Sequence, residues 1–286
     1  MVKFGAMKTR STVTTLPAPG RGAPAQRVRL KPIIVPAEHG GWGFLTEALL
    51  LGLLIAPTGA GALLAIATVL VFLSRQPTKL LLTEWRRRQF TARSRVATVV
   101  MAIELSLATL VFVLALYSAG LGVFWPLILA LPFGLIFLTN DMAHTMRTFR
   151  AEIAAPLALG AITASMALMG GWSAGYALAF WIVIAARAIP TVLLVRERVK
   201  LNHKRPARVA PPLIAHSLAL LLIGGLIWLG LLPPLAVAGF VVLLVRAIFF
   251  LFPKERMIPA RTVGFIEIGM GLQVVLFTAL GVWLQL

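Results

Sequence analysis

Nine long apolar segments dominate this chain and leave few folds open to it. A helix needs about 20 largely apolar residues to cross the hydrocarbon core of a bilayer. The segments cover residues 40–56, 60–82, 97–117, 121–140, 152–170, 173–195, 211–231, 234–252 and 263–286. We therefore expect an all-α polytopic membrane protein, a bundle of about nine transmembrane helices.

The composition of the chain points to the same environment. Hydrophobic residues make up 59% and charged residues 13% of the sequence, and the mean hydropathy is +0.93. Soluble domains contain about 25% charged residues on average, so this much apolar surface calls for lipid as solvent. The chain has no cysteine, which excludes disulfides, thiolate metal ligands and cysteine nucleophiles.

The connections between the segments alternate between uncharged and basic. Those after the first, third, fifth and seventh segments contain no charged residue, whereas the other four carry Lys and Arg. Because Lys and Arg accumulate in cytoplasmic loops, we predict a cytoplasmic N-terminus and an outer C-terminus. These loops explain the net charge of +18 and suit anionic membrane lipids. The sequence contains no basic stripe with interleaved aromatics, the pattern that would indicate nucleic-acid binding.

The chain divides into a tail and one membrane domain. Residues 1–35 contain seven Lys or Arg and no acid, and no early apolar run marks a cleavable signal peptide. We predict a disordered basic cytoplasmic tail; an organellar transit peptide is the alternative. Residues 36–286 are expected to form the nine-helix domain, in which short connections favour antiparallel neighbours.

Five ionisable residues lie inside the predicted spans: Glu47, Glu104, Arg187, Arg246 and Glu267. Each costs at least about 2.5–3.5 kcal/mol at the bilayer centre, so such residues pair, face the bundle interior or line a wet path. All five lie in the cytoplasmic half of their spans, about 8–14 Å deep at the helical rise. We predict a polar cavity that opens to the cytoplasm. Ion pairing, such as Glu47 or Glu104 with Arg187, is the structural alternative.

The first span opens with the motif "EHGGWG". On a helix, His39, Gly43 and Glu47 lie one above another on one face, with Glu38 and Trp42 in the adjoining row. The glycines leave room for a ligand or a neighbouring backbone. We take Glu38, His39 and Glu47 as candidate general bases and Trp42 as a ligand contact. The alternative for Glu38 is a helix N-terminal charge without a further role.

Basic residues mark the cytoplasmic ends of the second and sixth spans. Arg75 and Lys79 are four residues apart around Pro77, which tends to kink the helix. Arg187 and Arg198 follow one face of the sixth span. Arginine forks and lysine ammonium groups suit phosphate or carboxylate, so we expect these four cations to hold an anionic head group.

A third polar cluster follows the fourth span, in the stretch "TNDMAHTMR". We take Asn140 as a candidate ligand contact. Asp141 and His144 could form a metal site with Glu38 and His39, but the spacing matches no established metal-binding pattern. We therefore assign no metal ligand.

Four stretches together resemble the YwiC-like family of bacterial integral membrane proteins. They are "PAEHGGWGFLTEALLLGLLIAP", "FLSRQPTKLLLTEWRRR", "RTFRAEIAAPLALG" and "RAIPTVLLVRERVKL". The resemblance covers nearly everything after residue 35 and implies a multi-pass protein of the bacterial plasma membrane. It supplies no reaction.

The architecture is also similar, more remotely, to that of the UbiA-type intramembrane prenyltransferases. Those enzymes have nine helices and a cytoplasm-facing cavity, and aspartate-rich motifs hold magnesium ions that bind an isoprenyl diphosphate. Here the second helix ends in Arg75 to Lys79 and the sixth in Arg187 to Arg198, without paired aspartates. This departure puts magnesium-bridged diphosphate binding in doubt and leaves the cofactor open.

Three functional hypotheses follow from these patterns. The first is a UbiA-like transferase that acts on a lipid phosphate. The second is a proton- or anion-coupled transporter that uses Glu47, Glu104, Arg187 and Glu267. The third is a non-catalytic partner whose cavity holds a lipid or cofactor. In each case we expect membrane lipids, and a small anionic or isoprenoid ligand, as partners.

Overall fold

The computed structural model describes residues 31–36, 39–143, 145–146, 148–252, 255 and 257–285. Within these residues the chain forms ten α-helices and a short 3-10 helix, η1, and no strand. The helices are α1 (Lys31–Ile34), α2 (His39–Ile55), α3 (Gly59–Arg86), α4 (Ala92–Ala119), η1 (Leu121–Phe124), α5 (Trp125–Met142), α6 (Phe149–Met169), α7 (Ala174–Asn202), α8 (Ala210–Trp228), α9 (Ala236–Leu251) and α10 (Ala260–Leu284).

Each of the nine predicted segments forms a helix, so the all-α polytopic class is confirmed. Seven helices, α3 to α8 and α10, are long and apolar enough to cross a membrane. The apolar helices α2 and α9 are shorter, with 17 and 16 residues. At the helical rise each is about 25 Å long, slightly less than the hydrocarbon core of about 30 Å.

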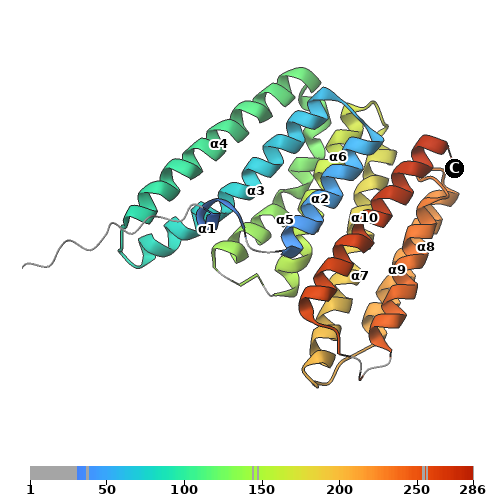
Figure 1. Ribbon diagram of the computed structural model, residues 1–286. Helices are drawn as coiled ribbons and strands as arrows, with labels where there is room; N and C mark the ends of the chain where they lie inside the picture. Colours follow the sequence, from blue (N-terminus) through green and yellow to red (C-terminus); the bar gives the residue numbers. More distant parts are fainter. Residues whose placement is uncertain are drawn as a thin grey trace, which may run out of the picture.

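The helices form one bundle in which most neighbours along the chain pack together. The strongest packing joins α3 with α4, α5 with α6, and α6 with α7. Helix α2 is an exception, since it packs mainly against α6 and α10 and only weakly against α3. Figure 1 shows the α3–α4 hairpin on one flank of the bundle, with α8 and α9 on the opposite flank.

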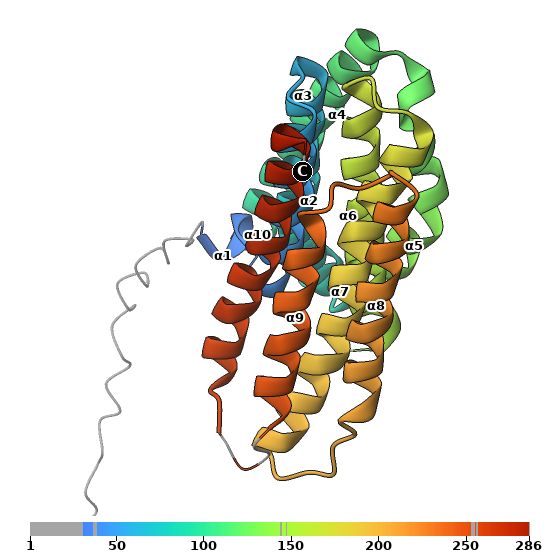
Figure 2. The same ribbon diagram turned by 90° about the vertical axis from the view of Figure 1, so that its right-hand side faces the viewer.

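The basic connections lie at one end of the bundle and the uncharged turns at the other. Figure 2 shows the basic α7–α8 and α9–α10 connections together at the lower end. At the other end, three uncharged turns contain Gly120, Gly171 and Gly230, whose φ angles are 77°, 83° and 70°. Glycine adopts these left-handed conformations without steric cost, which allows the helices to reverse direction within a few residues.

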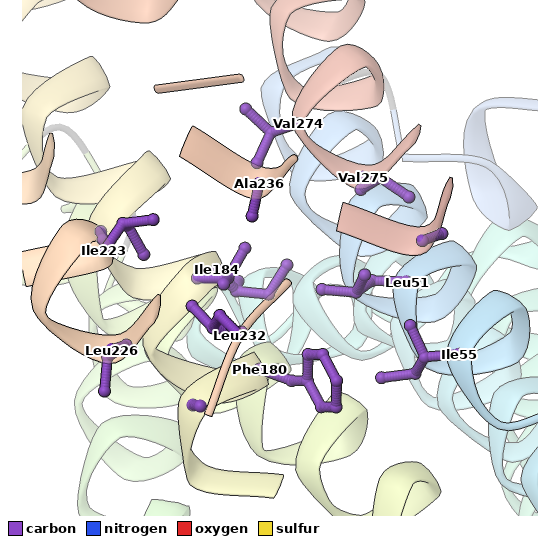
Figure 3. Close-up of a cluster of buried hydrophobic side chains, with 14 of the residues drawn as sticks. Leu51, Ile55, Phe180, Ile184, Ile223, Leu226, Leu232, Ala236, Val274 and Val275 are labelled. Atoms are coloured by element: carbon purple, nitrogen blue, oxygen red, sulfur yellow. The ribbon is translucent and has the colours of Figure 1, made fainter. Parts of the chain in front are cut away.

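The largest apolar core fills the half of the bundle next to the uncharged turns. It joins α2, α7, α8, α9 and α10 and includes Leu51, Phe180, Ile223, Ala236 and Val274 (Figure 3). Because lipid tails are as apolar as these side chains, close van der Waals packing, rather than escape from water, stabilises such a cluster in a bilayer.

A short helix forms in the last residues of the predicted 1–35 tail, whose residues 1–30 lie outside the described part. In α1, Ile33 is fully buried and packs with Leu80 of α3 and Ala97 of α4. Gln76 Nε2 donates a hydrogen bond to the Pro32 carbonyl at 3.1 Å. The chain is thus attached to α3 just before α2 begins.

Candidate functional site

A cavity of about 520 Å³ lies among α2, α3, α5, α6, α7 and α10. Its lining residues on α2, α6 and α10 come from the first half of each helix, and those on α3 and α7 from the middle and the second half. These are the halves next to the basic connections. Most of the wall is apolar and includes Phe44, Phe72, Phe137, Leu159 and Val195. The volume falls within the range of about 300–1,000 Å³ that is typical of small-molecule sites.

Four charged side chains form a buried cluster where the cavity meets the apolar core. Arg187 Nη2 lies 2.9 Å from Glu47 Oε1 and donates to the Glu267 carbonyl oxygen at 2.5 Å. Arg246 Nη1 donates to Glu267 Oε1 at 2.6 Å. The cluster therefore joins α2, α7, α9 and α10. Of the two ion pairs considered as the structural alternative, that of Glu47 with Arg187 is present, and no ion pair of Glu104 is found among the described residues. Glu47, Arg187 and Glu267 also line the cavity.

The close approach of three helices holds this cluster in place. A Cβ atom added at Gly271 would overlap the Glu47 carboxyl group and lie 2.7 Å from Arg187 Nη2. Only glycine therefore leaves space for the ion pair beside α10. The Phe44 ring lies 5.2 Å from the Arg187 guanidinium carbon, a distance at which cation–π attraction adds to the pairing.

A second group of charges joins α3 to α5. Asp141 is fully buried at the end of α5, with its carboxylate 2.8 Å from Arg75 Nε and 2.5 Å from Lys79 Nζ. The guanidinium carbon of Arg75 also lies 5.0 Å from the centre of the Phe72 ring and 4.4 Å from that of Phe137. Of the two cations that sequence analysis proposed here, Arg75 lines the cavity, whereas Lys79 is not among the lining residues.

Two further charged residues line the cavity from α6 and α7. Glu152 and Arg196 form an ion pair of 2.6 Å, and their side chains are 30% and 37% exposed. Neither residue was predicted from the sequence to belong to the site. The only signal was the position of Glu152 in the first turn of α6, where an acid is common because it complements the helix dipole.

Several predicted ligand contacts have other positions. Arg198 is fully buried and donates to the Phe250 carbonyl at the end of α9, at 2.8 Å. Trp42 donates to the Pro36 carbonyl at 3.1 Å and packs against Phe72. Neither Arg198 nor Trp42 is among the residues that line the cavity.

Asn140 stabilises the turn after α5 instead of lining the cavity. Its Oδ1 accepts hydrogen bonds from Thr145 Oγ1 at 2.9 Å and from Thr148 Oγ1 at 3.3 Å. Its Nδ2 donates to the Ile136 carbonyl at 2.8 Å. These bonds satisfy the side chain locally, in the last turn of α5.

The remaining candidates cannot be placed. Glu38 and His144 lie outside the described residues, as does the side chain of His39, whose backbone begins α2. Among the residues that are described, no group of three or more His, Asp or Glu side chains lies close enough to hold a metal ion. The fifth intramembrane charge, Glu104, lies apart from the cavity on α4.

The apolar helices and their buried charges define a polytopic membrane protein with a cavity in one half of the bundle. The sequence model of the family described as "YwiC-like protein" matches residues 35–167, the region that contains three of the four stretches in which the sequence resembles this family. The match ends within α6, and the resemblance of the stretch around Arg187 stays a prediction. No curated protein and no solved structure matches the chain, so the similarity to UbiA-type enzymes also stays a prediction.

Proposed function

We propose that the protein binds an amphiphile with an anionic head group, and that the cavity takes up this ligand from the cytoplasmic side of a bacterial plasma membrane. The observation that carries the proposal is the mixture of charged and apolar residues that line the cavity. Glu47, Arg75 and Arg187, which belong to three helices, line a space whose other walls are mostly apolar. A few convergent polar groups in an apolar pocket are typical of small-molecule sites.

The position of the cavity supports the side from which a ligand would enter. The cavity lies in the half of the bundle next to the basic connections, which the positive-inside rule assigns to the cytoplasm. The other half contains the packed core formed by residues such as Leu51 and Phe180 (Figure 3). This arrangement favours a pocket that is closed toward the outside.

Arg75 is the best candidate to bind the head group. Arg187 is enclosed by the Glu47 carboxylate and the Glu267 carbonyl. Arg75 lines the cavity from another helix, α3, and a guanidinium carries five N–H donors. The centres of the Phe72 and Phe137 rings lie 5.0 Å and 4.4 Å from the Arg75 guanidinium carbon, distances at which cation–π attraction contributes. Charge-assisted bonds from a guanidinium fork suit phosphate or carboxylate.

The apolar walls would hold the body of the ligand. Phe44, Val192, Val195, Val263 and Ile268 face the same cavity from α2, α7 and α10. An acyl or isoprenoid chain matches such walls because neither has a polar group that would need a partner. Membrane lipids and lipid-soluble metabolites are therefore the expected ligands.

A transfer reaction on the bound ligand is the second candidate function. It is favoured by the place of Glu47 on the cavity wall, because a general base must reach the proton that it removes. Transport is less well supported, since the buried charged cluster ends where the apolar core begins. Both functions would begin with the binding step proposed above.

Native mass spectrometry of the intact protein, purified from bacterial membranes in mild detergent, tests the binding step. We expect the protein to carry an amphiphile that chemical analysis identifies as a phosphate or carboxylate. Arg75→Ala should lower its occupancy at least about 10-fold, because a hydrogen bond to a charged group contributes about 1.5–3 kcal/mol. Ala158→Phe, which fills the cavity lined by Ala158, should lower it as well.

The exposed Arg93 offers a matched control. Arg93→Ala removes the same type of side chain from the cytoplasmic end of α4, away from the cavity, and should leave the occupancy unchanged. The proposal is wrong if the wild-type protein and the Arg75→Ala and Ala158→Phe variants carry the same molecules in the same amounts.

A further inference from the structure

Glu104 is a buried acid in the hairpin formed by α3 and α4. The buried residues of α4 lie on one face of the helix, and α4 packs mainly against α3. They are Ser94, Ala97, Glu104, Ala108 and Ala115. The rest of α4 carries exposed apolar side chains: Val99, Ile103, Leu105, Leu107, Leu110, Val113 and Leu114. Figure 1 shows α4 at the edge of the bundle. Glu104 thus lies between two helices, close to lipid.

The carboxyl group of Glu104 has no partner among the described residues. The residue is 7% exposed, and its Oε2 atom is buried without a hydrogen bond. None of the ion pairs found among the described residues includes Glu104. This distinguishes it from Glu47 and Glu267, each of which is paired with an arginine.

The charged groups on α4 and on the elements packed against it have other surroundings. On α3, Arg75 and Lys79 bind Asp141, Glu84 accepts a hydrogen bond from Ser94 at the start of α4, and Arg86 donates to the Met142 carbonyl at 3.3 Å. Arg93 and Arg95, in the first turn of α4, are exposed. The 3-10 helix η1 contains no ionisable residue. In α1 the one charged residue is Lys31, whose side chain lies outside the described part.

An ionised carboxylate in this position would be unstable, because burial removes its hydration and no opposite charge replaces it. A neutral carboxylic acid avoids this cost. It also carries an O–H donor, which a helix carbonyl one turn earlier can accept. Thr98 and Ser118 on the same helix donate in this way, at 3.0 Å to the Ser94 carbonyl and 2.6 Å to the Leu114 carbonyl.

We propose that Glu104 is a proton-binding site inside the α3–α4 hairpin, occupied by a proton at neutral pH. Loss of the proton at alkaline pH would place an uncompensated charge between the two helices. The packing of α4 on α3 is then strongest while the proton is bound. This site is independent of the cavity and of the ligand proposed for it.

Infrared difference spectroscopy of the full-length protein in lipid nanodiscs tests this inference. The spectrum of the wild type minus that of Glu104→Gln, taken at neutral pH, should contain the C=O stretch of a protonated carboxylic acid. Glu104→Asp should keep this band at a shifted frequency, and it serves as the test if the glutamine variant does not fold. The band should disappear when the pH is raised.

Glu267→Gln is the control within the same chain, because the Glu267 side chain is only 12% exposed but is paired with Arg246. Its difference spectrum should contain carboxylate bands and no carboxylic acid band. If the Glu104→Gln difference at neutral pH also contains carboxylate bands alone, Glu104 is ionised and the proposal fails. A cation from a second copy of the chain would produce that result.

Discussion

At the scale of single residues, the candidate site depends on one glycine as much as on its charges. Gly271 lies where α10 passes the Glu47–Arg187 pair, and any Cβ there would meet both side chains. The charged residues of this pair were predicted from the sequence because ionisable residues are rare within membrane spans. No role was predicted for Gly271, because a glycine at a helix contact looks the same in sequence as a glycine that faces lipid.

Gly271→Ala should destabilise the protein by about 1–3 kcal/mol, the usual effect of added volume in a tightly packed position. Gly269→Ala is the control on the same helix, because a Cβ there has no atom within 4 Å. It should be neutral or slightly stabilising, since alanine favours helix by up to about 1 kcal/mol. Thermal unfolding in detergent measures both effects, and equal melting temperatures for the two variants would contradict the tight packing around the pair.

At the scale of helices, ion pairs of two kinds hold α7 against its neighbours. The Glu47–Arg187 pair joins α2 and α7 and is buried, whereas the Glu152–Arg196 pair joins α6 and α7 and is partly exposed. Burial determines how much the loss of each pair lowers the free energy of unfolding. Removing one partner of a buried pair leaves an uncompensated charge, but water and salt screen an exposed pair.

We therefore expect Glu47→Gln to cost about 3–5 kcal/mol and Glu152→Gln to cost less than about 1 kcal/mol. The double variant Glu47→Gln/Arg187→Gln should regain much of the stability lost in Glu47→Gln, because no unpaired charge remains. Melting temperatures of the four proteins, wild type included, test this. A double variant that is less stable than Glu47→Gln would show that Arg187 has another essential partner.

Apolar runs and the helical period were sufficient to predict all nine long helices, and Gly, Pro and charged residues marked their ends. The packing of α2 against α6 and α10 was not predicted, because its short connection to α3 favours a neighbour along the chain. The contact between Asp141 and Arg75 was not predicted either, because residues so far apart in sequence share no periodic signal that would link them.

At the scale of the whole molecule, polarity is divided between the two halves of the bundle. The charged cluster and the cavity lie next to the basic connections, and the core around Phe180 lies next to the uncharged turns. The positions of the five ionisable residues within their spans predicted this division, and the charge pattern of the loops predicted its orientation. It could not predict the volume of the cavity or which cations line it, since Arg198 turned out to bind the end of α9.

The predicted orientation can be tested with topology reporters. Alkaline phosphatase fused to the C-terminus should be active, because this enzyme folds outside the plasma membrane, and a green fluorescent protein at the same position should be dark. The same reporters inserted in the basic connection 203–209 should give the opposite result. Fluorescence from the C-terminal fusion would show that the orientation is the reverse of the predicted one and that the cavity lies on the outer side.

The most direct test of the central claim is a cryo-electron microscopy structure of the protein purified with its native lipids in nanodiscs. We predict continuous density for a single amphiphile among α2, α6, α7 and α10, with its head group in contact with Arg75. The same map of the Ala158→Phe variant should lack this density. A wild-type cavity that contains only water, or that neighbouring side chains close, would contradict the claim that this protein binds a ligand there.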